Sequence, residues 1–314
     1  MRIGRAIACA LAFSLALATG VSASTRELKG SISADGSSTV GPYTTAAAEG
    51  FMKLHPKVRI TVGISGTGGG FERFCRGETD ISNASRPIKQ ATEAKTCREN
   101  GIRYIAFAVA NDGISVVVNK QNTWATCLTV GELKRIWEPG STIGNWKEVR
   151  PGFPDVPLKL FGPGTDSGTF DYFTAAIVGK ARASRSDYQA TEDDNVTVQG
   201  VANEKGGLGY FGFSYYEENQ DKLNLLAIDA GKGCVRPSVK TVQNGTYKPL
   251  GRPLFIYVKL ASFKRPEVQA FIKYILDNER EIAKKARFIP LTDKQLRNAK
   301  RLFRSAVFFA RRNG

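Results

Sequence analysis

The chain has 314 residues, and its 45 lysine and arginine residues outnumber its 29 aspartate and glutamate residues, for a formal net charge of +16 at pH 7. A basic balance of this kind suits nucleic acid or another anionic surface. However, the sequence has no zinc-ligand spacing, no RNA-binding aromatic motif and no basic heptad repeat. Its single histidine also leaves serine–histidine and cysteine–histidine catalysis without a good base. Composition therefore disfavours a nucleic-acid-binding module and a triad hydrolase.

Residues 1–23 have the composition of a secretory signal peptide. Two arginines precede the apolar run Ile7–Ala18, which is too short to span a membrane, and Val21–Ala23 supplies small residues at the cleavage positions. Cys9 lies inside the apolar run and is therefore not a lipid-anchored first residue. We expect an exported protein that resides in the periplasm without a lipid anchor.

Predicted strands and helices alternate along the mature chain. Runs of β-branched and apolar residues predict strands at Ser31–Ala34, Val58–Ile64, Ile81–Ala84, Ile102–Ala110, Ile114–Asn119, Leu158–Phe161, Leu208–Phe213 and Leu254–Leu260. Helices are predicted at Tyr43–Leu54, Gly70–Arg76, Val130–Trp137, Asp171–Val178, Val196–Asn203 and Glu267–Asn278. This alternation is typical of parallel sheets covered by helices, and so of an α/β fold.

Three loops rich in serine, threonine and glycine each follow a predicted strand and precede a predicted helix. They are Asp35–Gly41, Ser65–Phe71 and the turn within Phe161–Phe173, where Asp166 or Ser167 can cap the next helix. Glycines allow close approach of the backbone, and the first N–H groups of a helix lack partners, which favours an anion. One such loop is usually an ordinary capped turn. Three of them predict a small oxyanion held by several chain segments.

Removal of the signal peptide leaves four cysteines: Cys75, Cys97, Cys127 and Cys234. An even number in an oxidising compartment favours two disulfides, and the sequence leaves three pairings open. Metal binding is disfavoured because no CxxC motif occurs and His55 is the only histidine. We expect no metal and no cofactor.

Seven motifs in order resemble the PstS family, the phosphate-binding proteins of ABC transporters. They are Gly36–Pro42, Ser65–Phe71, Asp80–Ile88, Asp112–Asn119, Leu133–Gly140, Gly164–Phe173 and Gly206–Tyr216. The resemblance implies a type II periplasmic binding protein with two α/β lobes. Each lobe has a mostly parallel sheet flanked by helices, two hinge segments cross between the lobes, and phosphate is enclosed between them.

The resemblance also implies where the lobes divide and how the cysteines pair. Lobe 1 is expected to comprise residues 24–110 and 254–314, and lobe 2 residues 111–253. Family topology then places Cys75–Cys97 in lobe 1 and Cys127–Cys234 in lobe 2. Either alternative pairing would join the lobes and restrict the hinge closure that traps a ligand.

Several site residues follow from matching positions in the family's motifs. Ser38 and Thr39 are expected to bind phosphate from the first loop, and Ser65 is expected to donate its hydroxyl; Ser85 is expected to be a further ligand from the lower lobe. From the second lobe, the expected ligands are Ser167, Gly168 and Thr169. These hydroxyl and backbone donors suit an anion through charge-assisted hydrogen bonds.

Two positions depart from the best-known form of the family. There a site aspartate follows the serine that matches Ser85, whereas this chain has Arg86, and a site arginine is replaced here by Pro163. We expect Arg86 to supply the cation and either Asp166 or Asp112 to supply the carboxylate. A carboxylate accepts the proton of phosphate and repels sulfate, which carries no proton at neutral pH.

The sequence thus predicts a monomeric, non-enzymatic receptor that captures inorganic phosphate and delivers it to a membrane ABC permease, with no nucleic-acid partner. One alternative is a receptor for another tetrahedral oxyanion, such as sulfate or molybdate. A second alternative is a secreted hydrolase of phosphate esters, in which Ser167 would be the nucleophile.

Overall fold

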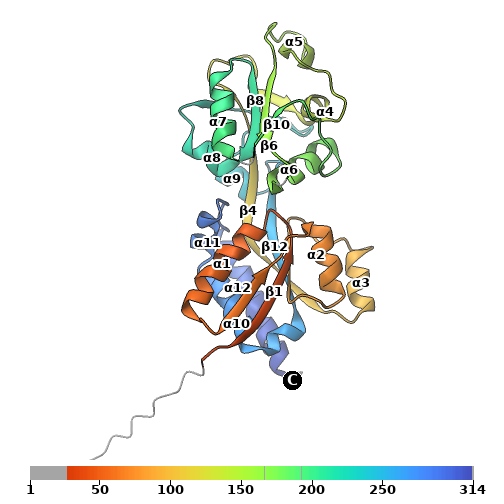
Figure 1. Cartoon of the computed structure of the whole chain (residues 1–314), viewed down its shortest axis with the longest axis vertical. Coiled ribbons are helices and arrows are strands. Elements are labelled where there is room, and N and C mark those ends of the chain that lie inside the picture. The colour runs from red at the N-terminus through yellow and green to blue at the C-terminus, as the bar shows by residue number, and fades with distance from the viewer. Residues whose placement is uncertain (1–26, 166, 192, 313–314) are drawn as a thin grey trace, which may run out of the picture.

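The structure is a computed structural model that describes residues 27–165, 167–191 and 193–312. The predicted signal peptide and Asp166, one of the two candidate carboxylates, lie outside the described residues. The chain forms two α/β lobes stacked along the long axis of the molecule and joined at a narrow waist (Figure 1). In the part of the chain that the structure describes, no helix is both long and apolar enough to cross a bilayer.

The lower lobe is built on five strands in the order β2–β1–β3–β12–β4. The first three are mutually parallel, whereas β12 runs antiparallel to both of its neighbours. The strands are β1 (Gly30–Gly36), β2 (Val58–Val62), β3 (Ile81–Ala84), β12 (Gly251–Lys259) and the first half of β4 (Tyr104–Asn119). The helices of this lobe are α1 (Gly41–Leu54), α2 (Gly66–Cys75), α3 (Glu93–Glu99), α10 (Pro266–Asp277), α11 (Glu279–Lys285) and α12 (Asp293–Arg312), with a 3₁₀ turn at Leu260–Lys264.

The second half of β4 continues into the sheet of the upper lobe, in the order β4–β8–β6–β7 with β9 also paired to β4. These strands are β6 (Lys159–Pro163), β7 (Gln189–Thr191), β8 (Gly207–Gly212) and β9 (Leu223–Leu225). A small second sheet contains β5 (Cys127–Thr129), β10 (Ala227–Asp229) and β11 (Cys234–Val235). The helices are α4 (Val130–Trp137), α5 (Trp146–Val149), α6 (Gly168–Phe173), α7 (Asp194–Asn203), α8 (Phe213–Glu218) and α9 (Val239–Gln243), with a π-helical turn at Thr174–Val178.

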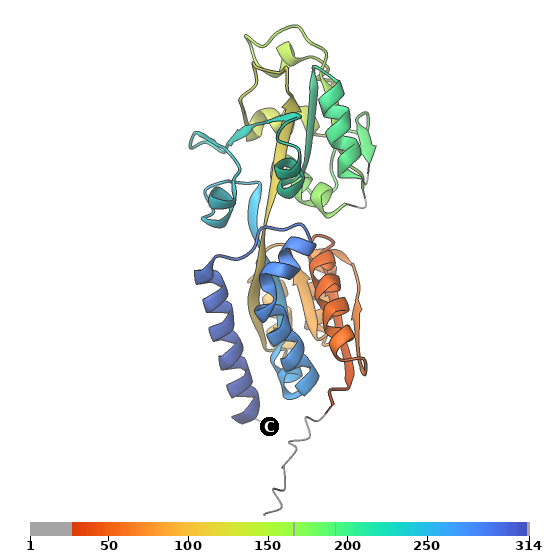
Figure 2. The same cartoon turned by 90° about the vertical axis from the view of Figure 1, so that its left-hand side faces the viewer.

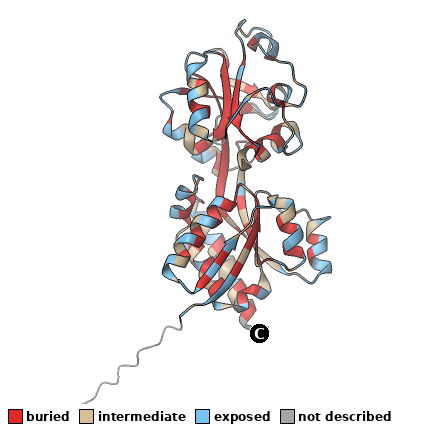
Figure 3. Cartoon of the chain, in the orientation of Figure 1, coloured by how far each residue is buried: buried red, intermediate tan, exposed pale blue. Residues whose placement is uncertain are grey.

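The two connections between the lobes are β4 and β12. The sequence predicted separate strands at Ile102–Ala110 and Ile114–Asn119, and this was wrong, because β4 is one continuous strand of 16 residues. The polar residues between those runs are held by pairing with the start of β12, where Asp112 lies opposite Arg252. The strand is buried along most of its length as it crosses the waist (Figure 3).

Each lobe has its own apolar core. In the lower lobe, α1, α10, α11 and α12 pack on one side of the sheet, around side chains such as Phe51 and Phe271, while α2 and α3 pack around Phe71 and Phe74. In the upper lobe, Trp137 is fully buried among aromatic side chains. These separate cores agree with two folding units, and the lobe boundaries stated above remain a prediction.

The disulfide pairing that the resemblance implied is confirmed. Cys75–Cys97 joins α2 to α3 within the lower lobe, and Cys127–Cys234 joins β5 to β11 within the upper lobe. Neither bond crosses the waist, so neither restrains the motion of one lobe relative to the other.

Candidate functional site

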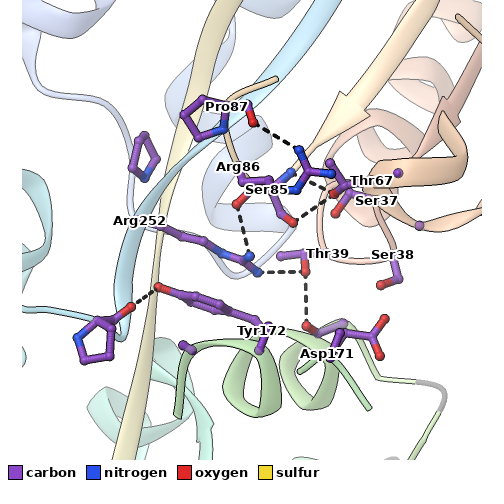
Figure 4. A pocket seen from close by; sticks show the side chains of 18 of the residues that line it. Ser37, Ser38, Thr39, Thr67, Ser85, Arg86, Pro87, Asp171, Tyr172 and Arg252 are labelled. Atoms are coloured by element: carbon purple, nitrogen blue, oxygen red, sulfur yellow. Dashed lines mark hydrogen bonds between the residues drawn. The ribbon is translucent and has the colours of Figure 1, made fainter. Parts of the chain in front are cut away.

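A cleft of about 710 Å³ lies between the lobes at the waist. Its walls come from five segments: the loop before α1, the start of α2, the residues after β3, the helical segment that begins with α6, and the start of β12 with the residues before it (Figure 4). The polar residues that line it are Ser37, Ser38, Thr39, Thr67, Ser85, Arg86, Lys89, Asp171, Tyr172, Lys248 and Arg252. Hydroxyls and cations dominate the polar groups of this wall, which suits a small anion.

The loop before α1 brings Ser38 and Thr39 to the cleft, as predicted. It leaves β1 at Gly36, whose φ of 136° is rarely adopted by other residues, and a Cβ there would lie 2.3 Å from the Asn83 carbonyl oxygen. Thr39 donates a hydrogen bond across the waist to the Gly168 carbonyl oxygen at 3.2 Å. The tight turn after β1 therefore places the Ser38 and Thr39 hydroxyl groups at the boundary between the lobes.

The second loop contributes Thr67, not Ser65. Helix α2 begins at Gly66, earlier than the predicted Gly70, so Ser65 becomes its exposed N-cap residue and is not among the residues that line the cleft. The Thr67 hydroxyl lies 3.0 Å from the Ser85 hydroxyl and also accepts the Ser85 N–H at 3.3 Å. The structure thus places Ser85 on the cleft wall as expected, and gives Thr67 the position expected for Ser65.

Arg86 lies on the cleft wall, where its guanidinium already has an acidic partner. It donates to both carboxylate oxygens of Glu93, at 2.9 and 2.7 Å, and to the Pro87 carbonyl oxygen at 3.1 Å. The pKa of Glu93 is lowered by hydrogen bonds from Arg86 and from the Lys89 backbone, which outweigh the opposing effect of burial. The charge of Arg86 is therefore partly compensated within the lower lobe.

A second arginine, Arg252, was missed by the sequence reasoning. Its guanidinium extends from β12 across the back of the cleft, donates to Thr39 Oγ1 at 3.1 Å and to the Ser85 carbonyl oxygen at 3.0 Å, and stacks 3.3 Å from the centre of the Tyr172 ring. Its side chain is only 15% exposed. Burial lowers the pKa of Arg252 from its usual value, yet a guanidinium stays protonated in proteins. This is a cation that solvent screens little.

Asp112, one of the two candidate carboxylates, lies behind the cleft and not on its wall. It is buried and pairs with Arg252, whose Nε and Nη2 both lie 3.4 Å from its Oδ2. Burial raises the pKa of Asp112, and the neighbouring Arg252 opposes that rise. The antiparallel register of the hinge strands makes this pair, so Asp112 holds the arginine in place and does not face the cavity.

The expected second-lobe ligands divide into two groups. Gly168 lines the cleft and touches the lower lobe so closely that a Cβ there would lie 2.6 Å from the Thr39 backbone nitrogen. Ser167 and Thr169 are not among the lining residues, because the Ser167 hydroxyl caps α6 by accepting the Thr169 N–H at 3.1 Å. Both are sequence neighbours of Gly168, which does line the cleft.

Asp171, which the sequence reasoning did not single out, is the carboxylate that the described residues present to the cleft. Its Oδ1 is buried without a hydrogen-bond partner, and its ion-pair partner Arg182 has Nε 3.9 Å away. Desolvation raises the pKa of Asp171, while the charge of Arg182, the nearby Ser38 hydroxyl and the more distant Arg252 lower it. The carboxylate therefore faces the lower-lobe hydroxyls across the waist and retains an acceptor that is not in use.

One signal in the sequence could have found Asp171. It lies in the same motif as Ser167, four residues further on, so one helical turn brings both to the same side of α6. Arg252 carried no comparable local signal, because only the pairing of β12 with β4 brings it to the cleft. Within the described ranges, no group of three or more histidine, cysteine, aspartate or glutamate residues could hold a metal ion.

The PBP superfamily domain model matches residues 21–279 of this chain. Protein SphX of Synechococcus elongatus is 49% identical over 277 residues, which cover 87% of this chain and 81% of SphX. The phosphate-binding protein PstS of Staphylococcus saprophyticus is 40% identical over 269 residues, covering 85% of this chain and 82% of that protein.

A solved structure extends the likeness to three dimensions. The crystal structure of a possible phosphate binding protein from Planctomyces limnophilus has 47% sequence identity and a TM-score of 0.86, and the match covers 89% of this chain and 99% of that one. Sequence and fold therefore agree across both lobes and the cleft between them. The chain belongs to the PBP superfamily, in the family that includes SphX and PstS.

Proposed function

We propose that this protein binds inorganic phosphate in the cleft between its lobes and delivers it to the permease of an ABC transporter. The observation that carries the proposal is that one cleft is lined by the buried cation of Arg252 and by the Asp171 carboxylate, together with hydroxyl groups from the lower lobe. The cation and the hydroxyls can donate to phosphate oxygens, and the carboxylate can accept the proton that phosphate keeps at neutral pH. The relative PstS is named a phosphate-binding protein and the Planctomyces protein a possible phosphate binding protein, which supports the same ligand.

The proposal gives each side chain a role. Ser38, Thr39 and Ser85 donate hydroxyls from the lower lobe, and Thr67 replaces Ser65 as the donor from α2. Gly168 supplies the closest approach of the upper lobe, with Ser167 and Thr169 beside it. Arg252 is the buried cation, and Arg86 is a second cation that can turn from Glu93 towards the ligand.

Contacts across the waist support closure of the lobes around the ligand. Thr39 donates to the Gly168 carbonyl oxygen, and Ser38 and Asp171 line the same cleft from opposite lobes, so donors of the lower lobe already meet groups of the upper lobe. A phosphate ion between them would replace these direct contacts with charge-assisted hydrogen bonds. We therefore take closure to be driven by the ligand, with lobe 1 at 24–110 and 254–314, lobe 2 at 111–253, and β4 and β12 as hinges.

The proposal also covers location and class. The protein acts as a monomeric, exported receptor in the periplasm without a lipid anchor, and not as an enzyme. The alternative in which Ser167 attacks a phosphate ester has little support, because the Ser167 hydroxyl is engaged as a helix cap. Turnover of a phosphomonoester by the mature protein, with or without divalent metals, would contradict the receptor assignment.

Isothermal titration calorimetry on ligand-stripped protein tests the ligand directly. We expect one phosphate per chain and no comparable binding of sulfate or molybdate at neutral pH, because neither of those anions offers a proton to Asp171. Equal affinity for phosphate and sulfate would refute the assignment of phosphate and favour a general oxyanion receptor.

A further inference from the structure

The C-terminal helix α12 carries a row of exposed cations that the phosphate site does not use. The outward side chains recur every three or four residues, so they form one stripe along the helix. This basic stripe consists of Lys294, Arg297, Arg301, Arg304, Phe308 and Arg312, all of them exposed. The opposite side of α12 packs on the lower-lobe core through Ala299, Ala306 and Ala310.

The cations of the basic stripe are not neutralised by the protein. Within the described residues, none of the five takes part in an ion pair, and Arg301 bonds only to the uncharged Asn298. The acid at the start of the helix, Asp293, pairs with Arg280 of α11, and Lys300, which lies outside the stripe, pairs with Asp277. Like charges at this spacing destabilise a helix, so the stripe favours an anionic partner outside the chain.

Apolar groups accompany the charges. Phe308 is 61% exposed between Arg304 and Arg312 of the stripe, with the Arg312 guanidinium 5.5 Å from its ring centre. Beside it, a groove of about 480 Å³ between α10 and α12 is lined by Phe303, Val307 and Ala270 among others. The arginines can attract anionic lipid headgroups, and the exposed phenylalanine beside them can enter the headgroup region.

We propose that the basic stripe of α12 binds the anionic headgroups of a phospholipid bilayer, with Phe308 entering the headgroup layer. Charge complementarity selects anionic lipid over neutral lipid. The same complementarity argues against a second copy of this chain, since two basic stripes would repel each other. A phosphodiester strand would match the charges but would not need the exposed phenylalanine or the apolar groove.

The position of α12 leaves the cleft free during such binding. The helix runs along the lower lobe on the side remote from α1, and its C-terminal end points away from the upper lobe (Figure 2). None of the residues that line the cleft belongs to α12. A protein held at a membrane through the basic stripe would therefore still exchange phosphate with solvent.

Vesicle flotation of the mature chain tests the proposal. We expect binding to vesicles containing about one-third phosphatidylglycerol, and none to pure phosphatidylcholine vesicles. Binding should be strong near 0.1 M salt and largely lost near roughly 0.5 M salt, because surface charges are screened. Failure to bind the anionic vesicles at the lower salt concentration, or equal binding to the neutral vesicles, would overturn the proposal.

Paired variants separate the basic stripe from net charge. Arg301→Gln/Arg304→Gln removes two stripe cations, and Lys205→Gln/Lys232→Gln removes two exposed cations of the upper lobe as the matched control. Each stripe cation is worth about fivefold in affinity, so the first variant should bind anionic vesicles roughly 25-fold more weakly and the control nearly as well as the parent. Equal losses in both variants would mean that overall charge alone is responsible, which would overturn the proposal.

Two further measurements complete the test. Phe308→Ser should weaken vesicle binding severalfold at unchanged salt dependence, and an unchanged affinity would overturn insertion of the ring. A fluorescent oligonucleotide that binds more tightly than the anionic vesicles would replace the bilayer with nucleic acid as partner. Phosphate affinity should be unaltered in every one of these variants, so this inference can fail while the proposed function holds.

Discussion

Asp171→Asn is the substitution that tests the chemistry of the cleft most directly. The amide has nearly the same shape as the carboxylate but carries no charge, and its nitrogen cannot accept a proton. A hydrogen bond to a charged group contributes roughly 1.5–3 kcal/mol, so phosphate binding should weaken about 10- to 100-fold. Asp171 Oδ1 has no hydrogen-bond partner in the protein, and its ion pair with the exposed Arg182 is long, at 3.9 Å, so the substitution removes little that holds the fold together.

The same change should have the opposite effect on sulfate. Two unit charges 4 Å apart repel by about 4 kcal/mol at an effective dielectric constant of 20, and this repulsion disappears in the amide variant. We therefore expect sulfate binding to appear, or to strengthen, as phosphate binding declines. The ratio of the two affinities is the informative quantity, since a general loss of structure would reduce both.

Calorimetric titrations with phosphate and sulfate at neutral pH measure this ratio. Asp155→Asn is the matched control, because that carboxylate also lies in the upper lobe but is exposed and pairs with Lys147 away from the cleft. The control should bind both anions like the parent. If Asp171→Asn keeps the parental preference for phosphate over sulfate, Asp171 is not the proton acceptor and the assignment of the carboxylate is wrong.

Three further predictions concern the hinge, lobe closure and pH. Arg252→Gln should weaken phosphate binding at least tenfold. It should also lower the free energy of unfolding by about 3–5 kcal/mol, because Asp112 is left buried and unpaired. Adding Asp112→Asn should restore stability, measured by urea unfolding, but not phosphate binding, measured by calorimetry. Gly168→Ala should weaken phosphate binding at least tenfold, since the new Cβ would clash with the Thr39 backbone. Small-angle X-ray scattering with phosphate present should then show a more open shape for this variant than for the parent. Glu279 is buried, which raises its pKa to about 7 from the usual 4.5, so it destabilises the folded state increasingly as pH rises from about 4.5 to 7, by up to about 3 kcal/mol. Glu279→Gln should therefore raise the free energy of unfolding more at pH 8 than at pH 5, and an equal change at both values would contradict this pKa.

Local pattern predicted most of the fold. The alternation of strands and helices, the strand at Ile81–Ala84 and the helix at Val130–Trp137 all appear in the structure as predicted. All three serine- and glycine-rich segments lead from a strand into a helix, and the disulfide pairing implied by the family was confirmed. These features depend on side-chain period, capping and motif order, which a single sequence carries.

Local pattern was less reliable where long-range pairing overrides it. The polar residues around Asp112 suggested a break between two strands, but β12 pairs with them and β4 continues through the waist. The start of α2 at Gly66 likewise moved the hydroxyl donor from Ser65 to Thr67. In both places a neighbouring element, and not the local composition, decided the backbone.

By itself, the sequence determined that this is an α/β chain with three loops suited to an oxyanion, and which family it resembles. Only the tertiary structure decided which charged groups meet at the cleft. Arg252 reaches Asp112 across 140 residues because the two hinge strands are antiparallel, and Thr39 meets Gly168 across 129 residues because the lobes face each other. The physical reason is that hydrophobic period and helix capping act over a few residues, whereas the partners of a buried charge depend on strand register and on the packing of one lobe against the other.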